Sequence, residues 1–300
     1  MRQFFSALLL AATLAAPALP MQQPSPFVGR WNFNLGSRAA WLGITQKAGA
    51  LDIWYQPTGG NVFQLKEFKV EGAKLILNLN RNTTWELTAA ANQLTGQQKQ
   101  GEKTMALTGN RAPALNRPMP KVWTTPEALF NGKDLTGWEP MGGPAKSHWI
   151  VQDGMIVNTE KGANLKSTRK FNDIKLHFEV FVPNHCNSGF YLRGRYEVQI
   201  ESEPLSDNPV ERRIGSIYGR LAPSIELPRK TDVWEVFDVT LVGRTVTVVR
   251  NGVTIHDKKE IEGITGGALD ANEAEPGPFY IQGDHTGGLK FRNITVSVPK

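Results

Sequence analysis

The residues with the clearest chemical potential lie in one short alternating segment, Tyr196-Glu-Val-Gln-Ile-Glu201. In an extended strand, Glu197, Gln199 and Glu201 occupy one face, and the two carboxylates lie about 13 Å apart at Cα. Paired carboxylates on a concave polar face are the groups that commonly cleave glycosidic bonds. A solvent-facing strand with ordinary surface glutamates gives the same alternation, so the pattern alone leaves both interpretations open.

Two further side chains precede this segment on positions that we expect to share its polar face, Tyr191 and Arg193. An arginine beside carboxylates keeps them ionised and offers a fork of donors to sugar oxygens. The histidines of the chain all lie in this half of the sequence, and His285 directly follows Asp284. The single cysteine, Cys186, excludes an intrachain disulfide and is expected to be a buried or loop residue rather than a nucleophile.

The elements that must position these residues are strands. Residues 174–182 alternate between apolar and polar side chains, with Glu179 on the polar face. Residues 245–255 predict a hairpin, because Asn251-Gly252 suits a type I′ turn. Helical periodicity is nearly absent, and residues 123–300 therefore predict a β-sandwich.

The first half of the chain predicts a separate all-β unit. Residues 27–111 form short alternating runs separated by Gly and Asn turns, which favours a small antiparallel barrel or sandwich of unknown role. Its tryptophans Trp41, Trp54 and Trp85 could stack on sugar rings, although core filling is favoured. Residues 112–122 hold three prolines and predict a semi-rigid linker.

The N-terminus indicates the cellular location of the protein, and the charge distribution indicates which binding partners are not expected. Residues 1–18 predict a signal peptide, with Arg2, an apolar stretch and a small-x-small cleavage site. We therefore expect a periplasmic or secreted protein without a transmembrane segment in its mature part, because no later run reaches about 18 apolar residues. The net charge of +6 comes from the front part of the chain and the linker, since residues 27–111 hold ten Lys or Arg against five Asp or Glu, whereas residues 123–300 hold 21 against 23. These basic residues are scattered, so nucleic-acid binding is not expected.

Six blocks of the second half resemble, in order, the 3-keto-disaccharide hydrolase family, over about residues 127–298. The blocks are Leu129-Phe-Asn-Gly-Lys-Asp-Leu-Thr-Gly-Trp138, Trp149-Ile-Val-Gln-Asp-Gly-Met-Ile156, Asn187-Ser-Gly-Phe-Tyr-Leu-Arg193, Tyr196-Glu-Val-Gln-Ile200, Gly215-Ser-Ile-Tyr-Gly219, and Gln282-Gly-Asp-His285 followed by Phe291-Arg-Asn-Ile294. The resemblance implies a concanavalin-like jelly roll that acts on glycosides already oxidised to a ketone at C3. It leaves residues 27–111 uncovered.

The resemblance also implies a chemistry and a site. A C3 ketone acidifies the C2 proton, so a base can remove it and the C1 substituent can leave, with water adding later to give net hydrolysis. By position, Glu197 and His285 are expected to be the acid–base pair, and Arg193 and Gln199 to hold the substrate. Glu179, Tyr191 and Glu201 are expected on the same face. A divalent metal is left open, and a sugar 3-oxidoreductase is implied as a functional partner that supplies the oxidised oligosaccharide or glycoside.

Two other functions remain open from the sequence. One is a conventional glycoside hydrolase in which Glu197 and Glu201 act on an unoxidised glycan. The other is a non-catalytic carbohydrate-binding jelly roll, because this fold serves binding proteins as easily as enzymes. The sequence does not indicate the sugar, the aglycone, the anomeric linkage or the oligomeric state.

Overall fold

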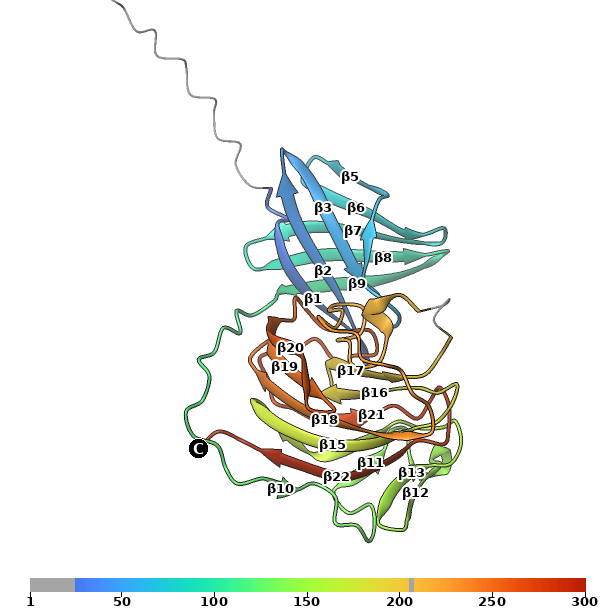
Figure 1. Cartoon of the computed structure of the whole chain (residues 1–300). Coiled ribbons are helices and arrows are strands. Elements are labelled where there is room, and N and C mark those ends of the chain that lie inside the picture. The colour runs from blue at the N-terminus through green and yellow to red at the C-terminus, as the bar shows by residue number, and fades with distance from the viewer. Residues whose placement is uncertain (1–24, 205–207) are drawn as a thin grey trace, which may run out of the picture.

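The computed structural model describes residues 25–204 and 208–300, and in this part of the chain regular structure consists almost entirely of strands (Figure 1). The predicted signal peptide, residues 1–18, lies outside the described residues. Within the described ranges no helix is long and apolar enough to cross a membrane.

A single curved sheet, here called the front sheet, contains the first nine strands. They are β1 (Gly29–Leu35), β2 (Arg38–Lys47), β3 (Ala50–Gln56), β4 (Phe63–Leu65), β5 (Phe68–Glu71), β6 (Lys74–Asn80), β7 (Thr83–Ala90), β8 (Gln93–Gln100) and β9 (Lys103–Arg111). All neighbours are antiparallel, in the order β4-β3-β2-β1-β9-β8-β7-β6-β5. The sheet curls around its own apolar core, so it is close to the predicted barrel.

Tryptophans occupy very different places in the front sheet. Trp85 is fully buried and packs against Phe33 with ring centroids 4.7 Å apart. Trp41 is also buried, but it packs against Ile264 and its neighbours from the second half of the chain. Core filling, which the sequence favoured, holds for these two, whereas Trp54 is exposed.

Residues 112–122 form neither strand nor helix, yet they are held against the second half of the chain. Leu115 is buried, and its carbonyl approaches Gly243 so closely that a Cβ there would lie 1.8 Å from the oxygen. Arg117 forms an ion pair with Asp173 at 2.9 Å. The proline-rich segment is therefore a strap rather than a free spacer.

The second half is a sandwich of two antiparallel sheets, which confirms the jelly-roll fold that the sequence predicted. The larger sheet has the order β12-β13-β22-β15-β18-β19-β20, with β10 added beside β22, and the smaller has the order β11-β14-β21-β16-β17. The larger sheet comprises β10 (Glu127–Ala128), β12 (Trp149–Gln152), β13 (Met155–Asn158), β15 (Ile174–Val182), β18 (Val233–Val242), β19 (Thr245–Arg250), β20 (Val253–Glu260) and β22 (Lys290–Ser297). The smaller comprises β11 (Trp138–Pro140), β14 (Leu165–Phe171), β16 (Asn187–Leu192), β17 (Tyr196–Glu201) and β21 (Gly277–Ile281). The described residues also include the short 3-10 helices η1 (Pro144–Lys146) and η3 (Val210–Arg212), which lie between strands.

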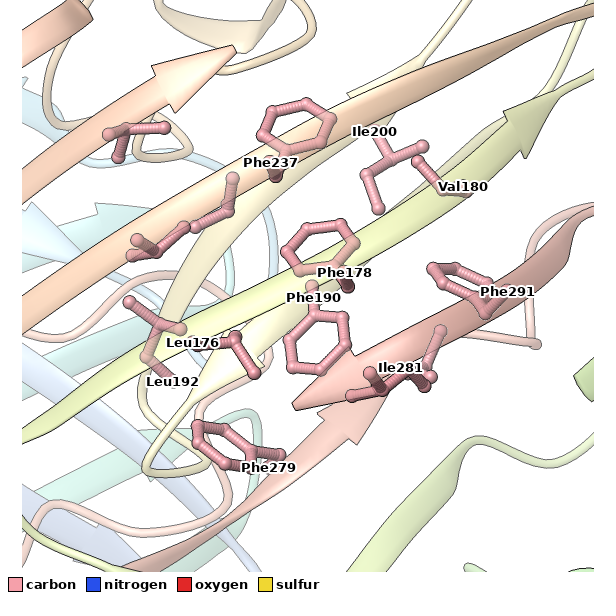
Figure 2. Packing of buried hydrophobic residues seen from close by; sticks show 14 of the residues in the cluster. Leu176, Phe178, Val180, Phe190, Leu192, Ile200, Phe237, Phe279, Ile281 and Phe291 are labelled. Carbon is pink, nitrogen blue, oxygen red and sulfur yellow. The ribbon is translucent and has the colours of Figure 1, made fainter. Parts of the chain in front are cut away.

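Phenylalanines fill the space between the two sheets (Figure 2). Phe178 of β15 stacks on Phe190 of β16 at 4.5 Å and on Phe237 of β18 at 5.0 Å. The apolar face predicted for residues 174–182 is buried in this core. The predicted turn at Asn251-Gly252 is also confirmed, since both residues have positive φ, 50° and 78°.

Strand β17 is buried on both faces. Tyr196, Val198 and Ile200 point into the sandwich core, and the polar side chains of the opposite face are covered by loops. One covering segment, residues 261–276 between β20 and β21, is here called the interface loop, because it also packs against the front sheet. The interpretation of β17 as an ordinary surface strand is therefore wrong.

Candidate active site

A polar cavity of about 330 Å³ lies over the outer face of the smaller sheet. Both halves of the chain contribute to its walls. From the second half come Met141, Asn164, Asn187, Tyr191, Glu197, Tyr218, Gly266, Gly267, Ala268, Leu269, Tyr280, Gln282, Asp284 and His285, and from the front sheet come Ser37, Arg38, Thr58, Gly59 and Gly60. Polar groups that converge in a cavity of this kind make it the candidate site for a ligand.

Glu197 is the second residue of β17 and is 2% exposed. Antiparallel pairing places it directly opposite Tyr191 of β16, while Gly189 lies opposite Gln199 on the same strand pair. A Cβ on Gly189 would lie only 2.1 Å from Oε1 of Glu197, so glycine is required there for the carboxyl to lie over the strand.

Burial governs the charge of this carboxyl. Desolvation raises the pKa of Glu197 to about 8, and the negative charge of Asp284 acts in the same direction, against the hydrogen bond from Tyr191. At neutral pH Glu197 is therefore mostly protonated. A carboxylic acid kept neutral in a cavity can donate a proton to a leaving group.

Two stacked tyrosines form the floor beside Glu197. The rings of Tyr191 and Tyr280 lie 3.8 Å apart with an interplanar angle of 14°. The Tyr191 hydroxyl lies 2.6 Å from Oε2 of Glu197 and 2.5 Å from the carbonyl oxygen of Gly266, and the Tyr280 hydroxyl donates to the carbonyl of Gly267 at 2.7 Å. The interface loop thus fixes both phenols.

The second titratable group of the cavity is a histidine–carboxylate pair. His285 Nδ1 lies 2.8 Å from Oδ1 of Asp284, and both side chains are about half exposed at the cavity. The hydrogen bond to Asp284 raises the pKa of His285 above its ordinary value. Because Asp284 accepts from Nδ1, the neutral ring carries its proton there and keeps Nε2 free to accept one. The cavity therefore contains an acid and a base.

The family of the chain follows from its second half. The model of the 3-keto-alpha-glucoside-1,2-lyase-like domain matches residues 125–297. The chain belongs to this family. Glu197, His285 and the two stacked tyrosines all lie within the matched segment, whereas the front sheet lies outside it. Membership in the 3-keto-alpha-glucoside-1,2-lyase-like family supports a carbohydrate-active function.

Solved structures with similarity to the chain include candidate glycosyl hydrolases of Parabacteroides distasonis. One is 31% identical, with a TM-score of 0.49 over 61% of this chain and 93% of that chain. A second is 18% identical, with a TM-score of 0.48 over 58% of this chain and 92% of the other. A Bacillus subtilis protein with a galectin-like fold is 13% identical, with a TM-score of 0.35 over 61% and 99% of the two chains. No curated protein matches the chain.

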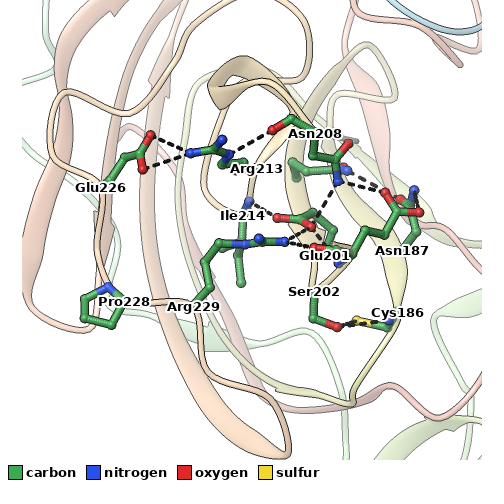
Figure 3. A network of polar contacts seen from close by, with 12 residues as sticks. Cys186, Asn187, Glu201, Ser202, Asn208, Arg213, Ile214, Glu226, Pro228 and Arg229 are labelled. Atoms are coloured by element: carbon green, nitrogen blue, oxygen red, sulfur yellow. Dashed lines mark hydrogen bonds and ion pairs between the residues drawn. The ribbon is translucent and has the colours of Figure 1, made fainter. Parts of the chain in front are cut away.

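Glu201, predicted at the substrate face, is instead a structural ion-pair residue (Figure 3). Its carboxylate is 1% exposed and is bound by Arg229, by the side chain of Asn208 at 3.2 Å and by the backbone N–H of Ile214 at 2.8 Å. It does not line the cavity. Glu197 and Glu201 therefore do not form a glycosidase pair. Loops cover the end of β17 that carries Glu201, and their residues bind its carboxylate.

Three other predicted substrate-binding residues also lie away from the cavity lining. Glu179 is on the larger sheet, where it binds Arg292 at 2.7 Å and Asn293. Arg193 lies in the turn after β16 and donates to the carbonyl of Gly243 at 2.8 Å. Gln199 is buried behind Asn187, 3.4 Å from its side-chain oxygen. Alternation placed these residues on a polar face but did not show which part of that face stays open.

The family segment contributes cavity residues to which the sequence assigned no role. They include Asn187, Tyr218 and Gln282, all inside the blocks that carry the resemblance. Tyr218 is held beside the acid, because its backbone N–H donates to the carbonyl of Glu197 at 3.1 Å. Its phenol and the amides are the donors available to a substrate ketone.

Burial raises the pKa of Cys186 to about 11, and its thiol lies 3.6 Å from the Ser202 hydroxyl, so it is a buried structural thiol, as the sequence favoured. Across residues 25–204 and 208–300, no group of three or more His, Cys, Asp or Glu side chains is arranged to hold a metal ion.

Proposed function

We propose that this protein cleaves 3-keto-α-glucosides by 1,2-elimination, with His285 as the base and Glu197 as the acid. The observation that carries the proposal is the presence of a proton donor and a proton acceptor in one cavity. Glu197 has a pKa of about 8 and holds a proton at neutral pH, while His285 has a free Nε2 beside the anchored Nδ1. The family description, a 3-keto-alpha-glucoside-1,2-lyase-like domain, supports the α-linkage and the elimination route.

The reaction balances with these two groups alone. His285 Nε2 takes the proton from C2, which the neighbouring C3 ketone has acidified, and the electron pair forms an enolate. Donors that line the cavity, among them Tyr218, stabilise the enolate oxygen. The enolate then expels the C1 substituent with formation of the C1=C2 bond, and Glu197 gives its proton to the leaving oxygen. The products are an unsaturated 3-keto sugar and the free alcohol, and later addition of water gives net hydrolysis.

The substrate chemistry implies a supplier. A glycoside acquires a C3 ketone only when an oxidoreductase removes two electrons and two protons from its C3 hydroxyl. We therefore infer that a sugar 3-oxidoreductase acts before this protein.

The test is turnover of a 3-keto-α-glucoside by the purified protein, with the unoxidised glucoside as the control and with a chelator present or absent. Cleavage of the keto substrate alone, with formation of the unsaturated product and loss of the C2 hydrogen in NMR spectra, supports the proposal. Cleavage of the unoxidised glucoside would indicate a conventional hydrolase. Sugar binding without cleavage of either would indicate a binding module.

Three variants sharpen this test. Glu197→Gln and His285→Ala are expected to lose about 10²–10⁴-fold in kcat, the usual contribution of a positioned acid or base. His177→Ala is the matched control, because His177 also pairs with an aspartate, Asp238, at 2.8 Å but lies on the larger sheet away from the cavity. Unchanged turnover in both Glu197→Gln and His285→Ala would refute the assignment.

A further inference from the structure

The front sheet reaches into the cavity of the second half. The turn between β1 and β2 brings Ser37 and Arg38 to the cavity, and the loop after β3 brings Thr58, Gly59 and Gly60. These residues lie outside the segment matched by the family. The wall they form is therefore a feature of this chain beyond its family domain.

The contact between this wall and the catalytic residues is close. Gln56, which is fully buried, donates to the carbonyl of Gly60 at 2.8 Å and braces the loop. A Cβ on Gly266 would lie 2.1 Å from that same Gly60 oxygen, so the two backbones touch. The carbonyl of Gly266 in turn receives the Tyr191 hydroxyl that lies beside Glu197. The interface loop thus lies between the front sheet and Glu197.

The two halves are also fixed to each other around the cavity. Arg220 lies 4.2 Å above the ring of Trp41 and donates to the carbonyl of Ile264. Asn32 of β1 donates to Glu273 and to the carbonyl of Ala271 at 2.8 and 2.9 Å. Buried hydrogen bonds of this kind hold the front wall in one position, so it can take part in recognition.

The chemistry of the wall indicates what it contacts. Its side chains are small or polar, and it has no aromatic ring on which a flat aglycone could stack. Arg38 is exposed, and its guanidinium forms no hydrogen bond or ion pair with any residue that the structure describes. A guanidinium offers five N–H donors, and Ser37 and Thr58 add hydroxyls, which together suit a ligand rich in hydroxyl oxygens.

We propose that the front sheet forms the binding subsite for the leaving group, and that Arg38 recognises a second sugar there. This inference rests on the proposed function, in which Glu197 protonates the leaving oxygen. Glu197 is buried, whereas Arg38 and its neighbour Ser37 in the wall are exposed, so a group attached to that oxygen that extends from Glu197 toward solvent can contact this wall. The favoured substrate is therefore a 3-keto-disaccharide or a longer saccharide rather than a simple alkyl or aryl glucoside.

The experiment compares Arg38→Ala with Arg81→Ala, a matched exposed arginine in the turn between β6 and β7 that does not line the cavity. Each is assayed with a 3-keto-disaccharide and with the methyl 3-keto-glucoside of the same anomeric form. For Arg38→Ala we expect the preference for the disaccharide, as a ratio of kcat/KM values, to fall roughly 10-fold, within the range for lost polar contacts. Arg81→Ala should leave the ratio unchanged. An equal effect of Arg38→Ala on both substrates, or no effect, overturns the proposal.

A binding measurement separates this inference from the proposed reaction. Calorimetry is carried out with the same two sugars in a Glu197→Gln background, which prevents turnover while keeping a neutral group that can form hydrogen bonds. Weaker disaccharide binding on adding Arg38→Ala, with methyl glucoside binding unchanged, supports the subsite even if the wild-type protein cleaves neither sugar. Equal disaccharide affinity with and without the arginine overturns the subsite even if cleavage is observed.

Discussion

The hydroxyl of Tyr191 lies 2.6 Å from Oε2 of Glu197, and the same hydroxyl lies 2.5 Å from the carbonyl oxygen of Gly266. A tyrosine has one hydrogen to donate, so it cannot satisfy an ionised carboxylate and a carbonyl together. A protonated Glu197 resolves this, because it donates to Tyr191 while Tyr191 donates to Gly266. The hydrogen-bond geometry and the raised pKa of Glu197 therefore agree that the carboxyl is neutral.

The first prediction concerns the pH dependence of kcat/KM. The base must be neutral, so activity rises with pH through the pKa of His285, which Asp284 raises above 6.5. The acid must be protonated, so activity falls as pH passes the Glu197 pKa of about 8. We expect a bell-shaped profile whose acid limb reports His285 and whose alkaline limb reports Glu197. A flat profile between pH 6 and pH 9 would contradict the assignment of both groups.

The second prediction concerns Tyr191→Phe. Among the described residues, Tyr191 forms the only hydrogen bond with the side chain of Glu197, and when this carboxyl ionises the hydroxyl can turn to donate to it, which lowers the pKa of the acid against the effect of burial. Removing the hydroxyl should raise that pKa further, so the alkaline limb of the profile should move to higher pH. We also expect a loss in kcat of roughly 10-fold or more, because the acid loses its orienting partner.

The matched control is Tyr280→Phe. Tyr280 stacks on Tyr191, but its hydroxyl donates to Gly267 rather than to Glu197. Its removal should leave the alkaline limb nearly in place. Equal shifts in the two variants would mean that the hydrogen bond to Glu197 does not set its pKa.

Sequence patterns predicted the strands well, because alternation follows directly from which face of a strand is buried. Alternation together with the family resemblance also identified Tyr191, Glu197 and His285, which all line the cavity. The same patterns failed for Glu201 and Arg193, since loops distant in sequence cover these residues and supply their partners. The contribution of the front sheet left no local signal. That contribution depends on how the front sheet packs against the second half, and the periodicity of residues 27–111 does not predict this packing.

The third prediction concerns the join between the two halves. Glu273 is fully buried, with Arg244 at 2.8 Å and hydrogen bonds from Tyr196 and Asn32. Burial alone would raise its pKa, but Arg244 and these hydrogen bonds hold the pKa below the ordinary value. We expect Glu273→Ala to lower the free energy of unfolding by about 3–5 kcal/mol, because it leaves Arg244 buried without its partner. Chemical denaturation at pH 7 measures this loss.

The same pair predicts the direction of acid destabilisation. A carboxyl whose pKa is depressed by folding stabilises the protein above its unfolded pKa, and this contribution is lost as pH falls through the folded pKa. The contribution of Glu273 should therefore decline below about pH 4.5. Glu226, which forms an exposed pair with Arg213, provides the control, and Glu226→Ala should cost less than about 1 kcal/mol. Equal losses in the two variants would show that burial does not make the Glu273–Arg244 pair contribute more to stability than an exposed pair.

The fourth prediction concerns the contact between the interface loop and the front sheet. Gly266→Ala would place a Cβ 2.1 Å from the carbonyl oxygen of Gly60, so one of the two backbones must move. Because Gly266 also receives the Tyr191 hydroxyl, that movement should disturb Glu197 and lower kcat, with a smaller effect on thermal stability. Gly59→Ala is the control, since a Cβ there meets no protein atom within 4 Å, and both variants are assayed with the methyl 3-keto-glucoside, which leaves the proposed leaving-group subsite empty. Wild-type kcat and an unchanged pH profile in Gly266→Ala would mean that the front sheet does not help to position the acid.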